Sequence, residues 1–222
     1  FNYADKILAV NRVMTKKINS SYVDKAVYLP NCLNLDYKLR TSKKTSTSKS
    51  LSSKLVVGAM GRLVNKKGFD FLVETFLEIS DVKLLIAGSG KEFKSLKKIA
   101  SENKNIQLLG WIRSKEKFFN KIDIFCSSSR IEPFGIVIIE AMARGIPIVS
   151  TKCNGPLDII TDKKNGLLIE INNKSELKKA ITQLKYNVKL RKKLGLNAEE
   201  KYKSNFTFKK YKKNINSIIS KL

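Results

Sequence analysis

Short apolar runs alternate with segments of helical spacing through most of this chain, from Lys54 onward. Glycine, proline or polar residues bound each run, which is typical of strands buried in a sheet. Between the first two runs, apolar residues from Phe69 to Leu77 recur at the spacing of one helix face. This alternation predicts an α/β fold with a parallel sheet that is covered by helices on both faces. The predicted strands are Leu55–Met60, Val82–Ala87, Asn105–Leu109, Ile122–Cys126, Ile146–Ser150 and Gly166–Ile169.

The polar loop after the fourth run leads into a short apolar helix. Pro133 and Gly135 mark a turn there, because proline fixes φ and glycine permits a close approach of the backbone. We expect the helix to begin near Phe134–Ile136, with its first amides at the carboxyl end of the preceding strand, which is a favourable position for an anion. Glu132 lies at the mouth of this helix, and Glu140 lies just over one turn inside it.

Two carboxylates beside a phosphate would normally repel it. They are compatible with a ligand in which hydroxyl groups flank the phosphates, because each carboxylate then accepts hydrogen bonds from those hydroxyls. A nucleoside diphosphate sugar has this layout, with a ribose diol, a diphosphate and sugar hydroxyls in sequence. The alternative is a buried amphipathic helix with one solvated glutamate, and the spacing alone leaves both interpretations open.

Four segments, in order, carry a resemblance to a known family. The sequence EPFGIVIIE, followed by AMARGIPIVS, resembles the signature of the retaining family-4 glycosyltransferases of the GT-B fold (glycosyl transferases group 1). Gly61–Gly68 resembles the diphosphate-binding loop of that family, and Asn154–Ile160 and Asn165–Ile169 fit its later segments. The resemblance covers residues 54–170 and implies a Rossmann-like sheet, the C-terminal, donor-binding half of a GT-B fold.

The resemblance also implies roles for individual residues. Arg62 and Lys67 would stabilise the departing diphosphate, Glu132 would hold hydroxyls of the transferred sugar, and Glu140 would hold the ribose diol. A packing role alone is the alternative for Trp111. No metal or other cofactor is expected, because the family is metal-independent and the chain has no Asp-x-Asp motif. The other implied donor contacts are Gly61, Trp111, Ile112, Phe134, Gly135 and Ile136.

The chain begins at Phe1, and its first part does not read as a complete domain. Tyr3–Val10 is similar to the segment that closes the N-terminal domain in the family, and Cys32 replaces the glycine of the usual turn. We therefore expect residues 1–40 to be the end of a truncated N-terminal GT-B domain, which lacks most of the acceptor site. The remaining expected parts are a flexible Ser/Thr/Lys linker at 41–53, the nucleotide-sugar-binding domain at 54–203, and a C-terminal helix at 204–222 that crosses back toward the N-terminal domain.

Composition excludes some kinds of site and leaves others open. The chain has no histidine, which excludes a Ser-His-Asp triad and a His-ligated zinc site within it. Its three cysteines form no metal-like pair and fit a reducing cytosol. The net charge of +25 fits general solvated charge, peripheral contact with an anionic membrane, or nucleic acid. No nucleic-acid-binding module is recognisable, so we expect no nucleic-acid partner.

These features together predict a cytoplasmic enzyme, with possible peripheral contact at the cytoplasmic face of the membrane. It would transfer a sugar from a UDP- or GDP-sugar to a saccharide or lipid-linked acceptor, in surface polysaccharide or glycolipid synthesis. The first alternative is a truncated, non-catalytic module that binds a nucleotide sugar. The second is a basic nucleic-acid-binding protein, whose binding would depend steeply on salt.

Overall fold

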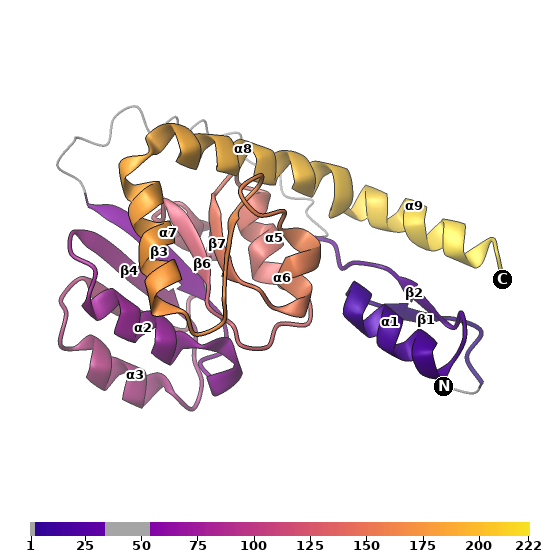
Figure 1. Cartoon of the computed structure of the whole chain (residues 1–222), viewed down its shortest axis with the longest axis horizontal. Coiled ribbons are helices and arrows are strands. Elements are labelled where there is room, and N and C mark those ends of the chain that lie inside the picture. The colour runs from indigo at the N-terminus through magenta and orange to yellow at the C-terminus, as the bar shows by residue number, and fades with distance from the viewer. Residues whose placement is uncertain (1–2, 34–53) are drawn as a thin grey trace.

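A computed structural model of the chain describes residues 3–33 and 54–222 (Figure 1). Most of the described residues form one α/β unit around a six-stranded parallel sheet, which confirms the predicted fold class. The predicted linker at 41–53 lies outside the described residues. The strands of this sheet are β3 (Leu55–Met60), β4 (Val82–Ala87), β5 (Ile106–Gly110), β6 (Ile124–Ser127), β7 (Ile148–Thr151) and β8 (Leu167–Ile169).

The strand order across the sheet is β5-β4-β3-β6-β7-β8. The chain starts at the central strand β3, builds outward through β4 and β5, and then returns to the other side of β3 with β6. The gap between the ends of β3 and β6 is therefore the point where the direction of winding reverses. In open α/β sheets, ligands bind outside the carboxyl ends of the strands at this switch point.

Helices cover both faces of the sheet, and alternate strand residues face opposite layers because the strand period is two. In β6, Ile124 and Cys126 belong to one apolar cluster and Phe125 belongs to the other. The first cluster is covered by α2, α3 and α7, and the second by α4, α5 and α6, while α8 contributes to both. The helices are α2 (Phe69–Leu77), α3 (Phe93–Ala100), α4 (Lys115–Phe119), α5 (Ile136–Met142), α6 (Asn154–Ile159), α7 (Lys174–Tyr186) and α8 (Val188–Asn205).

A small N-terminal unit lies beside the end of α8. It consists of β1 (Ile7–Ala9), α1 (Arg12–Ser21) and β2 (Ala26–Tyr28), and its two strands pair in parallel. The last helix, α9 (Phe208–Ile219), extends from α8 toward this unit (Figure 1). Of the described helices, none is long and apolar enough to cross a membrane.

Candidate functional site

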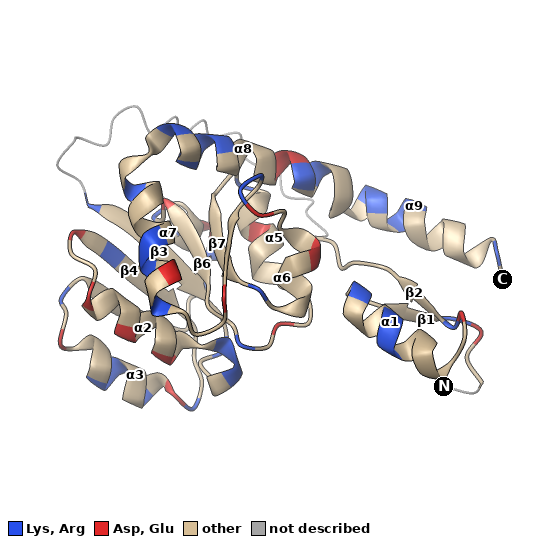
Figure 2. Ribbon diagram, in the orientation of Figure 1, with Lys and Arg blue, Asp and Glu red and all other residues tan. Residues whose placement is uncertain are grey.

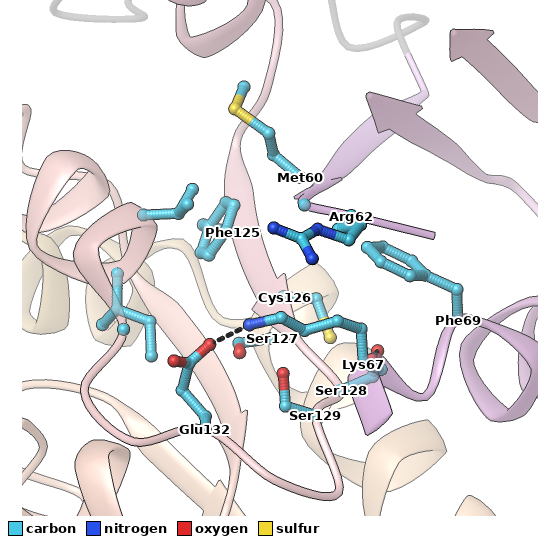
Figure 3. Close-up of a pocket in the computed structure, with 14 residues that line it drawn as sticks. Met60, Arg62, Lys67, Phe69, Phe125, Cys126, Ser127, Ser128, Ser129 and Glu132 are labelled. Carbon is cyan, nitrogen blue, oxygen red and sulfur yellow. Dashed lines mark hydrogen bonds and ion pairs between the residues drawn. The ribbon is translucent and has the colours of Figure 1, made fainter. Parts of the chain in front are cut away.

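A pocket of about 210 Å³ lies at the switch point, between the loops that follow β3 and β6 (Figure 3). The loop after β3 contributes one wall, and the loop after β6 together with the start of α5 contributes the other. The pocket therefore lies where the sheet topology predicts a ligand. Its polar side chains are those of Arg62, Lys67, Ser127, Ser128, Ser129 and Glu132.

Lys67 and Glu132 form an ion pair across the pocket, between the two walls. Lys67 ends a short 3-10 helix, η1 (Asn65–Lys67), and Glu132 lies four residues before α5 begins. Their side chains are only 22% and 15% exposed, so each charge is largely shielded from water and is balanced by the other. The pair brings together two residues that the sequence assigned to the two ends of a diphosphate sugar.

Gly68 allows the two loops to touch. It adopts a left-handed conformation with φ of 62°, and a Cβ added there would lie 2.2 Å from the carbonyl oxygen of Ser128. The Ser128 hydroxyl donates to the carbonyl of Lys67 at 3.1 Å. The amide of Arg130 donates to the carbonyl of Lys66 at 2.9 Å. The loop that carries Lys67 is thus bound directly to the loop that follows β6.

Arg62 is exposed, and its guanidinium points into the pocket (Figure 3). Within residues 3–33 and 54–222, no hydrogen bond or ion pair involves this side chain. A guanidinium in this state has all five N–H donors available and matches the geometry of phosphate oxygens. Arg62 is therefore the pocket cation that is free to bind an anionic ligand.

Glu140 lies on α5, beyond the pocket wall. One of its carboxylate oxygens accepts a hydrogen bond from Lys115 Nζ at 2.7 Å. Its other oxygen, Oε2, is buried and has no hydrogen-bond partner among the described residues. An unpaired buried acceptor is costly, so a hydroxyl donor from a ligand would satisfy it. Glu140 does not line the pocket itself, whereas Val137, one turn earlier on α5, does.

The side chains of three other predicted contacts, Trp111, Ile112 and Phe134, do not line the pocket. Trp111 is 79% exposed, so its side chain packs little against the described part of the chain. Ile112 packs against the apolar cluster under α5, and neither residue lines the pocket. The Phe134 side chain is buried against Phe206, with ring centroids 6.0 Å apart, so only the backbone of Phe134 faces outward toward Glu132.

Two glycines and the first residue of α5 complete the predicted set. Gly61 and Gly135 both line the pocket. Gly135 precedes α5 with φ of 108°, and no side chain caps this end of the helix. Ile136 begins the helix and is 37% exposed. The first amides of α5 are thus left uncapped beside the pocket, in agreement with the helix start that the sequence predicts.

Arg130 is a residue that the sequence analysis missed. Its guanidinium forms a bidentate pair with Asp70, at 2.7 and 2.8 Å, and also donates to the carbonyl of Asn65 at 2.7 Å. Its Nε donates to Asn172 Oδ1 at 3.0 Å. Arg130 therefore fixes the loop that carries Lys67 from both of its ends. No signal in the sequence identifies it, because its partners lie at least 42 residues away.

The Asp70–Arg130 pair should make the stability of the fold depend on pH. Burial raises the pKa of the Asp70 carboxyl, but hydrogen bonds from Arg130 and from the Phe71 amide, with the Arg130 charge, outweigh it, so the pKa is lowered. A lowered pKa stabilises the fold above the unfolded value of about 3.9, and this stability is lost as pH falls through the folded value. Asp70→Asn should cost about 1–2 kcal/mol at pH 7, since the pair is partly exposed, and less at pH 3.

Urea unfolding of wild type and Asp70→Asn at both pH values measures this difference. Asp81→Asn is a matched control, because the Asp81 side chain is 67% exposed and its ion pair is long, with 3.6 Å between Asp81 Oδ1 and Lys54 Nζ. Equal destabilisation by Asp70→Asn at pH 7 and pH 3 would contradict the assignment.

Comparison with known proteins decides the family. Residues 42–201 match the sequence profile of the family described as glycosyl transferases group 1. The chain belongs to this family. The resemblance carried by Gly61–Gly68 and by the segment from Glu132 to Ser150 is thereby confirmed.

Similar proteins of this family are longer than the chain. The lipopolysaccharide core biosynthesis glycosyltransferase LpsE of Rhizobium meliloti is 35% identical over 148 residues, which are 65% of this chain and 44% of that protein. An uncharacterized glycosyltransferase of Methanocaldococcus jannaschii, MJ1178, is 30% identical over 230 residues, which are 100% of this chain and 62% of that protein. The chain thus spans about half of the length of these relatives.

A solved structure shares the fold. The crystal structure of HepE from Anabaena in complex with UDP and glucose matches with a TM-score of 0.86 at 20% identity, over 100% of this chain and 64% of that one. At this identity the similarity establishes the fold alone.

Proposed function

We propose that this chain is the donor-binding part of a retaining glycosyltransferase. The whole protein would transfer a sugar from a UDP- or GDP-sugar to a saccharide or lipid-linked acceptor. The observation that carries the proposal is the pocket at the switch point, where the guanidinium of Arg62, which has no partner among the described residues, faces the Lys67–Glu132 pair (Figure 3). A relative that acts in lipopolysaccharide core synthesis supports a role in surface polysaccharide or glycolipid synthesis.

The chemistry requires stabilisation of a diphosphate leaving group. The bond between the anomeric carbon and the diphosphate oxygen breaks, and its electron pair leaves with the diphosphate. The acceptor hydroxyl bonds to the same carbon on the same face, and its proton passes to the departing diphosphate oxygen. Negative charge thus accumulates on the diphosphate, where Arg62 would bind two oxygens and Lys67 would act as a point charge. The uncapped amides of Gly135 and Ile136 would add hydrogen bonds.

The two cations would take the place of a metal ion, so the proposed reaction needs no cofactor. No carboxylate is assigned as a covalent nucleophile. Glu132 would accept hydrogen bonds from the transferred sugar, and Lys67 would lie between Glu132 and the diphosphate. Both residues already face one pocket and hold each other in place. Arg62, Lys67 and Glu132 are therefore the proposed catalytic set.

The nucleoside end would lie beyond the pocket, toward α4. Glu140 Oε2 is a buried acceptor without a hydrogen-bond partner in the described part of the chain, and it would bind the ribose diol. Trp111 and Ile112 precede α4, whose Lys115 pairs with Glu140, so the nucleobase would lie beside them. The backbone of Phe134 would contribute at the opposite, phosphate end.

Charge supports a weaker proposal on localisation. We infer a cytoplasmic protein, and its net charge of +25 would favour peripheral contact with anionic membrane. Lys and Arg are spread over α3, α7, α8 and α9 (Figure 2) and do not gather on one element. This distribution fits general solvated charge at least as well as a dedicated membrane surface. A non-catalytic nucleotide-sugar-binding module is the second candidate, and turnover of the donor distinguishes the two.

The proposal is tested by nucleotide-dependent stability. Thermal unfolding with UDP, GDP and ADP, and with their sugars, should show one nucleotide that raises the midpoint. A ligand at about 100 times its Kd stabilises the folded protein by about 2.7 kcal/mol. If no nucleotide or nucleotide sugar binds, the donor-binding assignment is wrong. Turnover of the bound donor then separates the enzyme from the non-catalytic module.

Glu140→Gln tests the ribose contact in the same assay. The variant should weaken binding of the ribonucleotide about tenfold, because a charge-assisted hydrogen bond becomes a neutral one. Binding of the 2′,3′-dideoxy analogue should not change, since it lacks the hydroxyls. A Glu140→Gln variant that weakens both ligands equally would count against the ribose contact.

A further inference from the structure

The N-terminal unit reaches the candidate site through the side chain of Asn11. Asn11 is 2% exposed and caps the start of α1, where its Oδ1 accepts from the amide of Met14 at 2.7 Å. Its Nδ2 donates to the carbonyl of Pro133 at 2.7 Å. The two ends of one buried amide thus bind the start of α1 and the carbonyl of Pro133, which lies 122 residues from Asn11.

Pro133 directly follows Glu132, so this hydrogen bond acts on the loop that carries the carboxylate. Proline has no N–H, and its carbonyl is therefore the group through which this residue can be held. The carbonyl of Glu132 accepts from the amide of Gly155, at the start of α6, at 2.9 Å. Glu132 is thus held from α6 on one side and from the N-terminal unit on the other.

A second bond ties the same end of α1 to α6. The amide of Arg12 donates to Asp158 Oδ2 at 2.7 Å. Asn11, Arg12 and α6 therefore form one connected support beneath the Glu132 loop. Between the described residues of the N-terminal unit and the loop that carries Arg62, no hydrogen bond occurs. The support therefore reaches the wall that carries Glu132 and not the wall that carries Arg62.

We propose that Asn11 is a positioning residue for Glu132. The proposal rests on the proposed function, in which Glu132 holds the transferred sugar. The Asn11 side chain fixes Pro133 and thereby places the neighbouring carboxylate against Lys67. A displacement of the N-terminal unit is transmitted to the sugar contact, while the diphosphate contact of Arg62 is left in place.

Two variants separate this role from helix capping. Asn11→Asp and Asn11→Ser both keep a good N-cap for α1, and both lose the amide donor to Pro133. Each should lower the affinity for the nucleotide sugar about tenfold, which corresponds to about 1.4 kcal/mol. Affinity for the free nucleoside diphosphate should fall by a clearly smaller factor, because Arg62 and Lys67 lie on the other wall of the pocket. This split is not expected from a general loss of stability, which would affect both ligands together.

Asn19→Ala is the matched control. The Asn19 side chain also bridges two segments of the N-terminal unit, because it accepts from the amide of Ala26 at 2.6 Å and donates to its carbonyl at 3.1 Å. Within the described residues, none of the hydrogen bonds of this side chain reaches the Glu132 loop. Asn19→Ala should therefore leave both ligand affinities unchanged. Equal loss of sugar affinity in Asn19→Ala, or wild-type sugar affinity in either Asn11 variant, overturns the proposal.

Amide hydrogen exchange distinguishes failure of this proposal from failure of the proposed function. In Asn11→Ser without ligand, exchange at residues 134–137 should be faster than in wild type, and it should be unchanged in Asn19→Ala. If wild type binds no nucleotide sugar but exchange changes as expected, the connection stands and the sugar role is wrong. If exchange is unchanged in Asn11→Ser, the connection itself is wrong.

Discussion

Arg62→Ala is expected to abolish the stabilisation of the protein by its nucleotide and to leave the free protein as stable as wild type. The guanidinium points into the pocket and has no protein partner within the described residues, so the fold does not depend on it. A nucleotide at about 100 times the wild-type Kd adds about 2.7 kcal/mol, and most of this should be lost with the bidentate phosphate contact. Thermal unfolding with and without the nucleotide measures both quantities.

Lys66→Ala is the control for charge. Lys66 lies in the same loop and is exposed, but it does not line the pocket. Its replacement removes the same unit of charge and should preserve nearly the whole ligand-induced shift. If Arg62→Ala retains the shift, or if Lys66→Ala loses it to the same extent, the pocket is not the anion site.

Gly155→Ala is expected to destabilise the fold by about 3 kcal/mol or more and to weaken ligand binding at the same time. A Cβ at this position would lie 2.3 to 2.5 Å from three backbone atoms of Phe134. Backbone cannot move aside as a side-chain end can, so α6 must shift away from the loop of Glu132. The hydrogen bond from the Gly155 amide to the Glu132 carbonyl would then lengthen or break.

Gly61→Ala is the control for the loss of stability expected in Gly155→Ala. A Cβ at Gly61 would meet only the ring of Phe69, at 3.6 Å, which is an ordinary van der Waals contact. Urea unfolding should therefore give Gly61→Ala a free energy of unfolding near that of wild type. If the two variants have equal stability, the close packing of α6 on the Glu132 loop is not what limits substitution at Gly155.

Much of the fold follows from local patterns. The predicted bounds of β3 and β4 are those of the structure, because each run begins after a charged residue and ends before a glycine. Asn173 caps α7, because its side chain accepts from the amide of Glu176 three residues later. By contrast, β6 begins at Ile124 and not at Ile122. The first residue of a strand depends on where pairing with the neighbouring strand starts, and here Ile124 pairs with Val57 of β3. The C-terminal helix predicted from 204 begins at Phe208, because α8 continues to Asn205 and Thr207 caps the new helix.

The sequence by itself determined the order of strands and helices along the chain, the loop in which each candidate side chain lies, and the types of chemistry available. These depend on residue type and short-range spacing, which hold whatever the rest of the chain does. Tertiary structure alone decided the partners: Lys67 with Glu132, Arg130 with Asp70, and Asn11 with the carbonyl of Pro133. Each of these contacts joins loops from different strands or units. Their geometry exists only once the sheet has brought those loops to one edge, because no local pattern encodes a distance across it.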